Sequence, residues 1–195
     1  MAMTPDTREY RNFQITELRA EGENSYQIEG YAVKFESEAV LYEIDGIKYK
    51  EVIDRNAFTG AEMSDVVLNF NHKGKPVART RNNTLTLTVD TVGLKVNANL
   101  GGTEEGRRLF EEIKGGYLDK MSFAFIVNRS EYDKANHLRR ITAFKRIFDV
   151  AVVDFPAYDA TEVAARSWAK AEAELEKRNA AKEKLLLKIK LAKGD

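Results

Sequence analysis

Ser122 and His72 are of residue types that together could carry out nucleophilic catalysis. A serine hydroxyl is a weak nucleophile at its free pKa, so it needs a base within hydrogen-bond reach. Ser122 lies within residues 121–127, whose apolar and aromatic side chains favour a strand that would hold it rigidly. His72 comes just after the apolar run 66–70, and a histidine at a strand end can reach a cleft.

Asp149 is the residue that could orient such a base. It stands in the apolar run Ile147-Phe-Asp-Val150, where burying an ionised carboxylate is costly unless it has a partner. A place behind His72 in a Ser-His-Asp triad would supply that partner. Asp154 is a weaker candidate of the same type. His72 and Ser122 lie 50 residues apart, so only the fold can bring the three together.

Each candidate also has an ordinary structural interpretation. A serine in an apolar strand is usually a small sheet residue, a histidine before a turn is usually a loop residue, and Asp149 could face solvent at a sheet edge. The chain has a second histidine, His137, so a histidine base has two candidates. No HExxH, GxSxG, Walker or dinucleotide-binding motif is present, and we expect neither a cofactor nor a metal.

Strands are predicted over most of the first 155 residues, because β-branched and aromatic residues alternate with polar ones. An Asp45-Gly46 pair between two such runs predicts a hairpin. Lys73-Gly-Lys-Pro76 predicts a turn, and the polar stretch 130–137 predicts an exposed hairpin loop. The predicted strands are 13–18, 26–35, 66–70, 84–90, 93–100, 121–127 and 138–153.

Two short helices are predicted beside these strands. Asp54 is a candidate N-cap for a helix over residues 55–63, and Thr103 is one for a helix over residues 104–114. The pair Gly115-Gly116 would end the second helix. Many strands with two helices predict a mostly β, α+β domain with an antiparallel, barrel-like core.

The composition changes at residue 161, which predicts a body over residues 10–160 and a charged amphipathic helical tail over residues 161–195. The tail holds nine Lys and Arg against six Asp and Glu, a net charge of about +3. Arg178 and Lys182 interrupt its apolar stripe, which argues against a stable coiled coil. We expect a solvated or partner-docking helix, with a nucleic-acid-binding arm as the alternative.

The bulk composition excludes several classes of protein. With 43% hydrophobic residues the chain can bury a core, so wholesale disorder is excluded. Lys and Arg equal Asp and Glu at 31 each, which predicts binding to neither nucleic acid nor an anionic membrane. No stretch approaches the roughly 18 apolar residues of a membrane span. The polar start predicts no secretion signal, and the absence of cysteine fits a reducing compartment.

Six segments, taken in order, resemble the tailed-phage prohead (capsid maturation) serine proteases. The resemblance covers roughly residues 10–163, and its specificity comes from the order of the set, with His72 before a hairpin and Ser122 after a double-glycine helix end. The segments are Gly30-Tyr-Ala-Val-Lys-Phe35, Glu51-Val-Ile-Asp-Arg-Asn-Ala-Phe58, Asn69-Phe-Asn-His72, residues 86–94, Met121-Ser-Phe-Ala-Phe125 and residues 149–158.

This resemblance implies a fold and a site. The family is similar in fold to herpesvirus assemblin, a β-barrel flanked by helices. Its catalytic histidine falls on His72, its nucleophile on Ser122 and its acidic position on Asp149. The sequence departs from the family pattern in having Asp for Glu at Asp149, Ala for Ser at Ala151 and Ala for Gly at Ala124.

Assemblin relatives imply alternatives for two roles. Their third catalytic residue is a second histidine, which points to His137. We rank it below Asp149 because His137 falls in the predicted exposed hairpin. By the same analogy, Arg139 or Arg140 would stabilise the oxyanion, with backbone N–H groups as the other source.

The function implied by the resemblance is capsid maturation. Family members cleave the scaffold portion of the major capsid protein precursor, and themselves, inside the prohead in the cytoplasm of the bacterial host of a phage or prophage. We therefore expect the capsid precursor and further copies of this chain, as a homo-oligomer, to be the partners. The alternatives are an inactive capsid assembly module on the same fold and a non-peptidase β-barrel binding domain.

Overall fold

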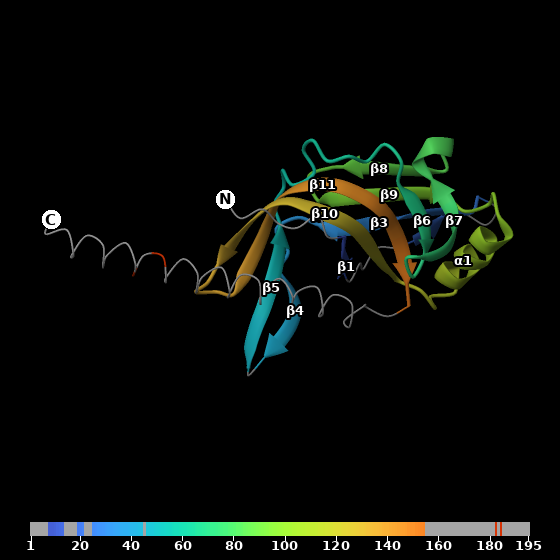
Figure 1. The fold of residues 1–195 in the computed structure, drawn as a ribbon. Coiled ribbons are helices and arrows are strands. Elements are labelled where there is room, and N and C mark those ends of the chain that lie inside the picture. The colour runs from blue at the N-terminus through green and yellow to red at the C-terminus, as the bar shows by residue number, and fades with distance from the viewer. Residues whose placement is uncertain are drawn as a thin grey trace, which may run out of the picture.

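The computed structural model describes residues 8–13, 19–21, 25–44 and 46–154, together with Lys182 and Lys184. Within these residues the chain forms two β-sheets with one α-helix at one end (Figure 1). The elements are β1 (Glu9–Phe13), β2 (Arg19–Glu21), β3 (Gln27–Lys34), β4 (Ala39–Ile44), β5 (Ile47–Ile53), β6 (Val67–Phe70), β7 (Lys73–Arg79), the 3₁₀ turn η1 (Thr80–Asn82), β8 (Leu85–Val89), β9 (Gly93–Asn99), α1 (Glu104–Lys114), β10 (Lys120–Asp133) and β11 (Leu138–Val153).

The larger sheet is organised around β11. The antiparallel hairpin of β10 and β11 arches across the molecule, from the β4–β5 hairpin to the β6–β7 hairpin (Figure 1). Residues Leu138 to Ile141 of β11 pair in parallel with β5, and residues Asp149 to Val152 pair in parallel with β6. β1 adds to the free edge of β10, which gives the order β1-β10-β11-β5-β4. One long strand therefore connects two hairpins that are far apart in the sheet.

The smaller antiparallel sheet has the order β2-β3-β9-β8. Alternating residues of its strands enter a core shared with β10, β11 and α1. The rings of Phe123, Phe125 and Phe144 lie within 5.7 Å of one another at their centroids in this core. The predicted mostly β, α+β class is confirmed.

The predicted barrel is wrong, because the two sheets are not closed on one another. In the part of the chain that the structure describes, each sheet keeps its own ladder. Alternation in a sequence fixes which face of a strand is buried, and it does not fix which strand edges join. The sequence pattern of a barrel and that of two packed sheets are therefore the same.

Of the two predicted helices, only that over residues 104–114 forms. Thr103 Oγ1 accepts a hydrogen bond from Gly106 N at 2.9 Å, and α1 then runs to Lys114. Residues 55–63 form turns and an isolated bridge instead, so that prediction is wrong. Asp54 Oδ1 accepts from Asn56 N at 2.9 Å in a local turn. The backbone beyond it bonds to β11, as in the 2.7 Å bond from Phe144 N to Ala57 O.

The predicted turn at Lys73-Gly-Lys-Pro76 is also wrong. The chain reverses at Asn71 and His72, which have φ values of 51° and 57°, and residues 73–76 belong to β7. Positive φ at both central residues is the requirement of a type I′ hairpin turn. Pro76 is tolerated in β7 because this strand pairs with β6 alone and lies at an edge.

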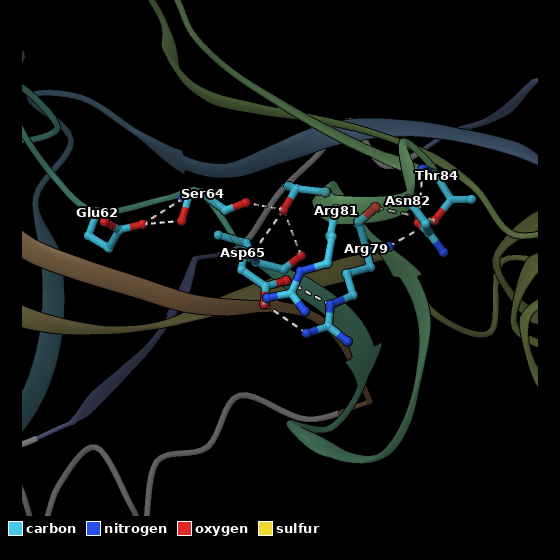
Figure 2. Close-up of polar contacts among 9 residues, drawn as sticks. Glu62, Ser64, Asp65, Arg79, Arg81, Asn82 and Thr84 are labelled. Atoms are coloured by element: carbon cyan, nitrogen blue, oxygen red, sulfur yellow. Dashed lines mark hydrogen bonds and ion pairs between the residues drawn. The ribbon is translucent and has the colours of Figure 1, made fainter.

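The base of the β6–β7 hairpin is held by a cluster of polar side chains (Figure 2). Asp65 accepts from Nε and Nη2 of Arg79, both at 2.7 Å, and from Arg81 Nη2 at 2.6 Å. Thr80 Oγ1 accepts from Val66 N at 2.9 Å. These contacts join the two residues before β6 to the end of β7 and its following residues, and so fix the end of the hairpin that lies opposite the turn at Asn71 and His72.

The β10–β11 hairpin is present, but its strands reach further than predicted. β10 continues to Asp133 and β11 begins at Leu138, which shortens the predicted loop of residues 130–137. The tail predicted over residues 161–195 lies outside the described residues apart from Lys182 and Lys184. Residues 14–18 of the predicted strand 13–18 also lie outside them. No helix in the described part of the chain has the length and apolarity needed to cross a bilayer.

Candidate active site

The structure brings together the three residues predicted as a triad. His72 Nε2 lies 2.6 Å from Ser122 Oγ, and His72 Nδ1 lies 2.5 Å from Asp149 Oδ1. The three side chains come from the β6–β7 turn, from β10 and from β11. Distances of this size are hydrogen bonds, so the imidazole bridges the hydroxyl and the carboxylate.

The register of the larger sheet explains this meeting. Ser122 stands opposite Ala151, and Asp149 stands opposite Ala124, on neighbouring antiparallel strands. Residues two positions apart on a strand share a face, so the hydroxyl and the carboxylate project from the same side of the sheet. The two alanines are small and fully buried, which leaves the space above them to the imidazole. β6 lies beside β11 and ends at the turn that carries His72.

The site is almost closed to solvent. Ser122 is 0% exposed, and the side chains of Asp149 and His72 are 3% and 10% exposed. A buried carboxylate must be partnered, and Asp149 binds both His72 and the guanidinium of Arg8. An Nδ1 proton donated to Asp149 leaves Nε2 free to accept the Ser122 proton. The arrangement is therefore chemically suited to general-base activation of a serine.

His137 lies elsewhere. Its Nδ1 is 3.2 Å from the Tyr132 hydroxyl, and its ring centroid is 5.0 Å from that of Tyr49. It belongs to the turn at the far end of β10 from Ser122, on the order of 30 Å away at the usual rise of a strand. The structure does not bring His137 to Ser122.

The two arginines considered for the oxyanion are paired with carboxylates. Arg139 is buried, and its Nη1 lies 2.8 Å from Glu9 Oε2 and 3.1 Å from Glu51 Oε2. Arg140 Nη1 donates to Glu36 at 2.8 Å, and this hydrogen bond is the main cause of the raised pKa of Arg140. Asp154 lies at the end of β11, where its backbone N–H donates to Asn71 Oδ1 at 3.3 Å.

Sequence reasoning missed the strand that covers the site. The ring of Tyr10 meets the imidazole of His72 edge to face, with 4.8 Å between centroids, and Arg8 pairs with Asp149. Ser122 Oγ also lies 2.9 Å from the backbone oxygen of Arg11. These contacts join residues 62 to 141 positions apart, and nothing in the local pattern of residues 8–13 signals them.

Asn69 lies in one of the segments that resemble the family, and no role was predicted for it. It stands in register with Ala151, the ladder partner of Ser122, so it belongs to the same row across the sheet. Its Oδ1 is buried and has no hydrogen-bond partner among the described residues. A lone buried polar atom is rare, and its position in the row of the nucleophile is a feature that only the register reveals.

Comparison with known proteins gives one family. No curated protein and no solved structure matches the chain. The expected likeness to herpesvirus assemblin therefore stays a prediction. The match to the family covers residues 13–176, which is well over half of the 195 residues and extends past the predicted start of the tail. The chain belongs to the caudovirus prohead serine protease family.

Proposed function

We propose that this chain is a serine endopeptidase that cleaves the scaffold portion of the major capsid protein precursor, and itself, during prohead maturation. The family supports a capsid maturation protease. The observation that carries the proposal is the single imidazole of His72, within hydrogen-bond reach of Ser122 on one side and Asp149 on the other.

The mechanism that we propose is acyl transfer. His72 Nε2 takes the Ser122 proton as Oγ bonds to the scissile carbonyl carbon, and Asp149 stabilises the resulting imidazolium. The imidazolium then gives its proton to the leaving amine as the C–N bond breaks. Water, deprotonated by the same imidazole, then bonds to the acyl carbon, and the imidazolium returns its proton to Ser122 Oγ as the ester C–O bond breaks. Backbone N–H groups are the oxyanion donors that we propose, because Arg139 and Arg140 already bind carboxylates.

The test is cleavage of the cognate capsid precursor by wild type and by Ser122→Ala. We expect the variant to leave the precursor and its own chain intact. Ser37→Ala, an exposed serine in the loop after β3, is the matched control and should cleave as wild type does. Unchanged cleavage by Ser122→Ala would overturn the proposal.

Two other functions are open to direct tests. An inactive assembly module would bind the capsid precursor without cleaving it. A fluorophosphonate that labels wild type and spares Ser122→Ala would exclude that function. A non-peptidase binding domain predicts a His72–Ser122 separation far beyond hydrogen-bond range, and the 2.6 Å distance is against it.

The proposal extends to residues 161–195 as a helical tail separate from the body of residues 10–160. We propose that the tail is a self-cleaved segment that docks on the scaffold or the capsid precursor. Its change of composition supports this. A chain that ends near residue 158 should enter proheads poorly, and normal incorporation of that chain would contradict the proposal. We propose separately that the enzyme acts as an oligomer inside the prohead.

A further inference from the structure

We propose that β1 occupies the substrate position, and that the enzyme cleaves extended peptides with arginine before the scissile bond and glutamate two residues earlier. Glu51 binds the arginine side chain, and Arg139 binds the glutamate side chain. This inference rests on the proposed function, because it assigns a substrate class to the same site.

The first observation is the closure of the nucleophile. Ser122 is 0% exposed, so no substrate can reach it unless something moves. β1 is the strand that lies beside it, with Asn12 opposite Ser122 in the ladder. Ser122 Oγ donates a hydrogen bond to the backbone oxygen of Arg11 at 2.9 Å. The carbonyl group of the Arg11–Asn12 peptide bond therefore contacts the nucleophile, and we take this bond as the position of the scissile bond.

The second observation is the mode of pairing. β1 is an edge strand of the larger sheet and adds to β10 in antiparallel register from Glu9 to Phe13. Without β1, no described strand would pair with this edge of β10. Addition of an extended peptide to an open sheet edge is a recurrent mode of peptide recognition, with backbone bonds giving affinity and side-chain pockets giving specificity.

The third observation is a pair of bidentate contacts on the face of β1 away from the triad. Arg11 donates to Glu51 through Nε at 2.5 Å and Nη2 at 2.9 Å. Arg139 donates to Glu9 through Nη1 at 2.8 Å and Nη2 at 3.1 Å. Alternate residues of a strand share a face, so one Glu-Xaa-Arg segment makes both contacts at once.

The environment of these contacts makes them selective. Glu51 and Arg139 are 1% and 2% exposed, and they lie 3.1 Å apart, so they remain paired if β1 leaves. The planar fork of arginine matches a carboxylate in two places, which an amide or a lysine cannot reproduce. A strand with a neutral residue in place of Glu9 or Arg11 would leave Arg139 or Glu51, respectively, with fewer partners in a buried site.

The other face of β1 adds contacts at the triad itself. Tyr10, between the two charged residues, packs on His72, and Arg8 pairs with Asp149. Arg8 is 39% exposed at its side chain, so its charge is more screened than that of Arg11. A substrate strand must displace β1, and the two compete for one edge.

The experiment uses the full chain and quenched fluorescent peptides that copy its residues 6–14. Relative to the parent peptide, we expect the peptide with Arg11→Gln to lose at least about tenfold in kcat/KM, with Glu9→Gln and Arg11→Lys losing severalfold. The Arg8→Gln peptide removes the same charge from a more exposed position and should lose less than about threefold. An Arg11→Gln peptide cut as fast as the parent would overturn the inference.

Competition between β1 and the substrate peptide is tested by changing β1 in the enzyme itself. The full chain with Glu9→Gln and Arg11→Gln should cleave the parent peptide severalfold faster than wild type, because its own strand binds the edge more weakly. An equal or slower rate would contradict occupation of the substrate position by β1. The peptide series needs no change to the enzyme, so it stands even where this variant folds poorly.

The source of the peptide is resolved by mass spectrometry of the full chain incubated alone. A cut between Arg11 and Asn12 that is lost in Ser122→Ala identifies the N-terminus of this chain as a substrate. An intact chain that still cleaves the peptides identifies β1 as a bound competitor, with the substrate supplied by another protein. Ser122-dependent cleavage of the capsid precursor without any preference for Glu-Xaa-Arg would sink this inference and leave the proposed function standing. Absence of all cleavage would sink both.

Discussion

The two histidines of this chain occupy hairpin turns, both with positive φ, and have different surroundings. His72 has φ 57° in the β6–β7 turn, and His137 has φ 49° in the β10–β11 turn. The imidazole of His72 lies between a carboxylate and a serine hydroxyl. The imidazole of His137 lies against the hydroxyl of Tyr132 and the ring of Tyr49.

The difference comes from the neighbouring strands and not from the turns. β11 pairs with β6 near one turn and with β5 near the other. Near His72 it contributes Asp149, whereas near His137 the adjacent β5 contributes Tyr49 and a backbone bond from Lys50 N to His137 O of 2.8 Å. A tight turn orients an imidazole, and the strands beside it decide what the imidazole can do.

The largest expected effect is the difference in cleavage activity between variants of the two histidines. His72→Ala should reduce cleavage of the capsid precursor by at least about 10³-fold, because it removes the base that accepts the Ser122 proton. His137→Ala should stay within about threefold of wild type. Precursor cleavage followed on gels measures both, at equal folded fractions. Similar losses in the two variants would remove the functional contrast between the turns.

A second, smaller effect concerns the carboxylate behind His72. Asp149→Asn should lower kcat by on the order of 10²- to 10⁴-fold, because the amide cannot stabilise the imidazolium. Asp133→Asn is the matched control, since Asp133 is the exposed carboxylate beside the other turn, where it accepts from Ala135 N at 2.9 Å. A greater loss in His137→Ala than in Asp149→Asn would make His137 the third catalytic residue.

Lowering the pH should weaken the docking of β1, the strand that covers His72. Burial raises the pKa of Glu9, but Arg11 and Arg139 outweigh it and hold this pKa below its ordinary value of 4.5. Docking of β1 is therefore favoured by ionised Glu9 above pH 4.5 and weakened as the pH falls through the lowered pKa.

Hydrogen exchange of residues 8–13 in wild type and in Glu9→Gln measures this effect at matched pH. Wild type should be better protected by about tenfold near pH 6, and the difference should shrink as the pH falls below 4.5 through the lowered pKa of Glu9. The pKa of Asp133 beside the other turn is also lowered, chiefly by the Asn136 side chain, so Asp133 also becomes protonated in acid. Because Asp133 is present in both wild type and Glu9→Gln, the difference between the two proteins isolates the contribution of Glu9. A constant difference across this range would contradict the assignment.

The smallest effect tests whether the two turn backbones are equivalent. A left-handed conformation costs an L-residue about 1–2 kcal/mol, and glycine largely escapes this cost. His72→Gly should be more stable than His72→Ala by about 1 kcal/mol, and His137→Gly should exceed His137→Ala by a similar amount. Urea unfolding measures both differences. A difference at one turn only would show that the turns are strained unequally.

Local signals in the sequence were sufficient for the elements they cover. The Thr103 cap and the double glycine predicted α1, and period-2 alternation predicted the β8–β9 hairpin, because each depends on contacts within a few residues. The helix predicted after Asp54 failed because the backbone of those residues bonds to β11, far along the chain. The turn at Asn71 and His72 was missed because neither residue is the glycine that usually marks such a turn.

The residue types of the site and their order along the chain could be read before any coordinates. Residue types made His72, Ser122 and Asp149 candidates, and the ordered resemblance of the segments around them to a known family selected them over their ordinary interpretations. Their distances, the separation of His137 and the cover of β1 required the fold, because strand register and edge pairing join residues 50 to more than 100 positions apart. Such contacts depend on which strands become neighbours, and that is decided by burial of the whole core.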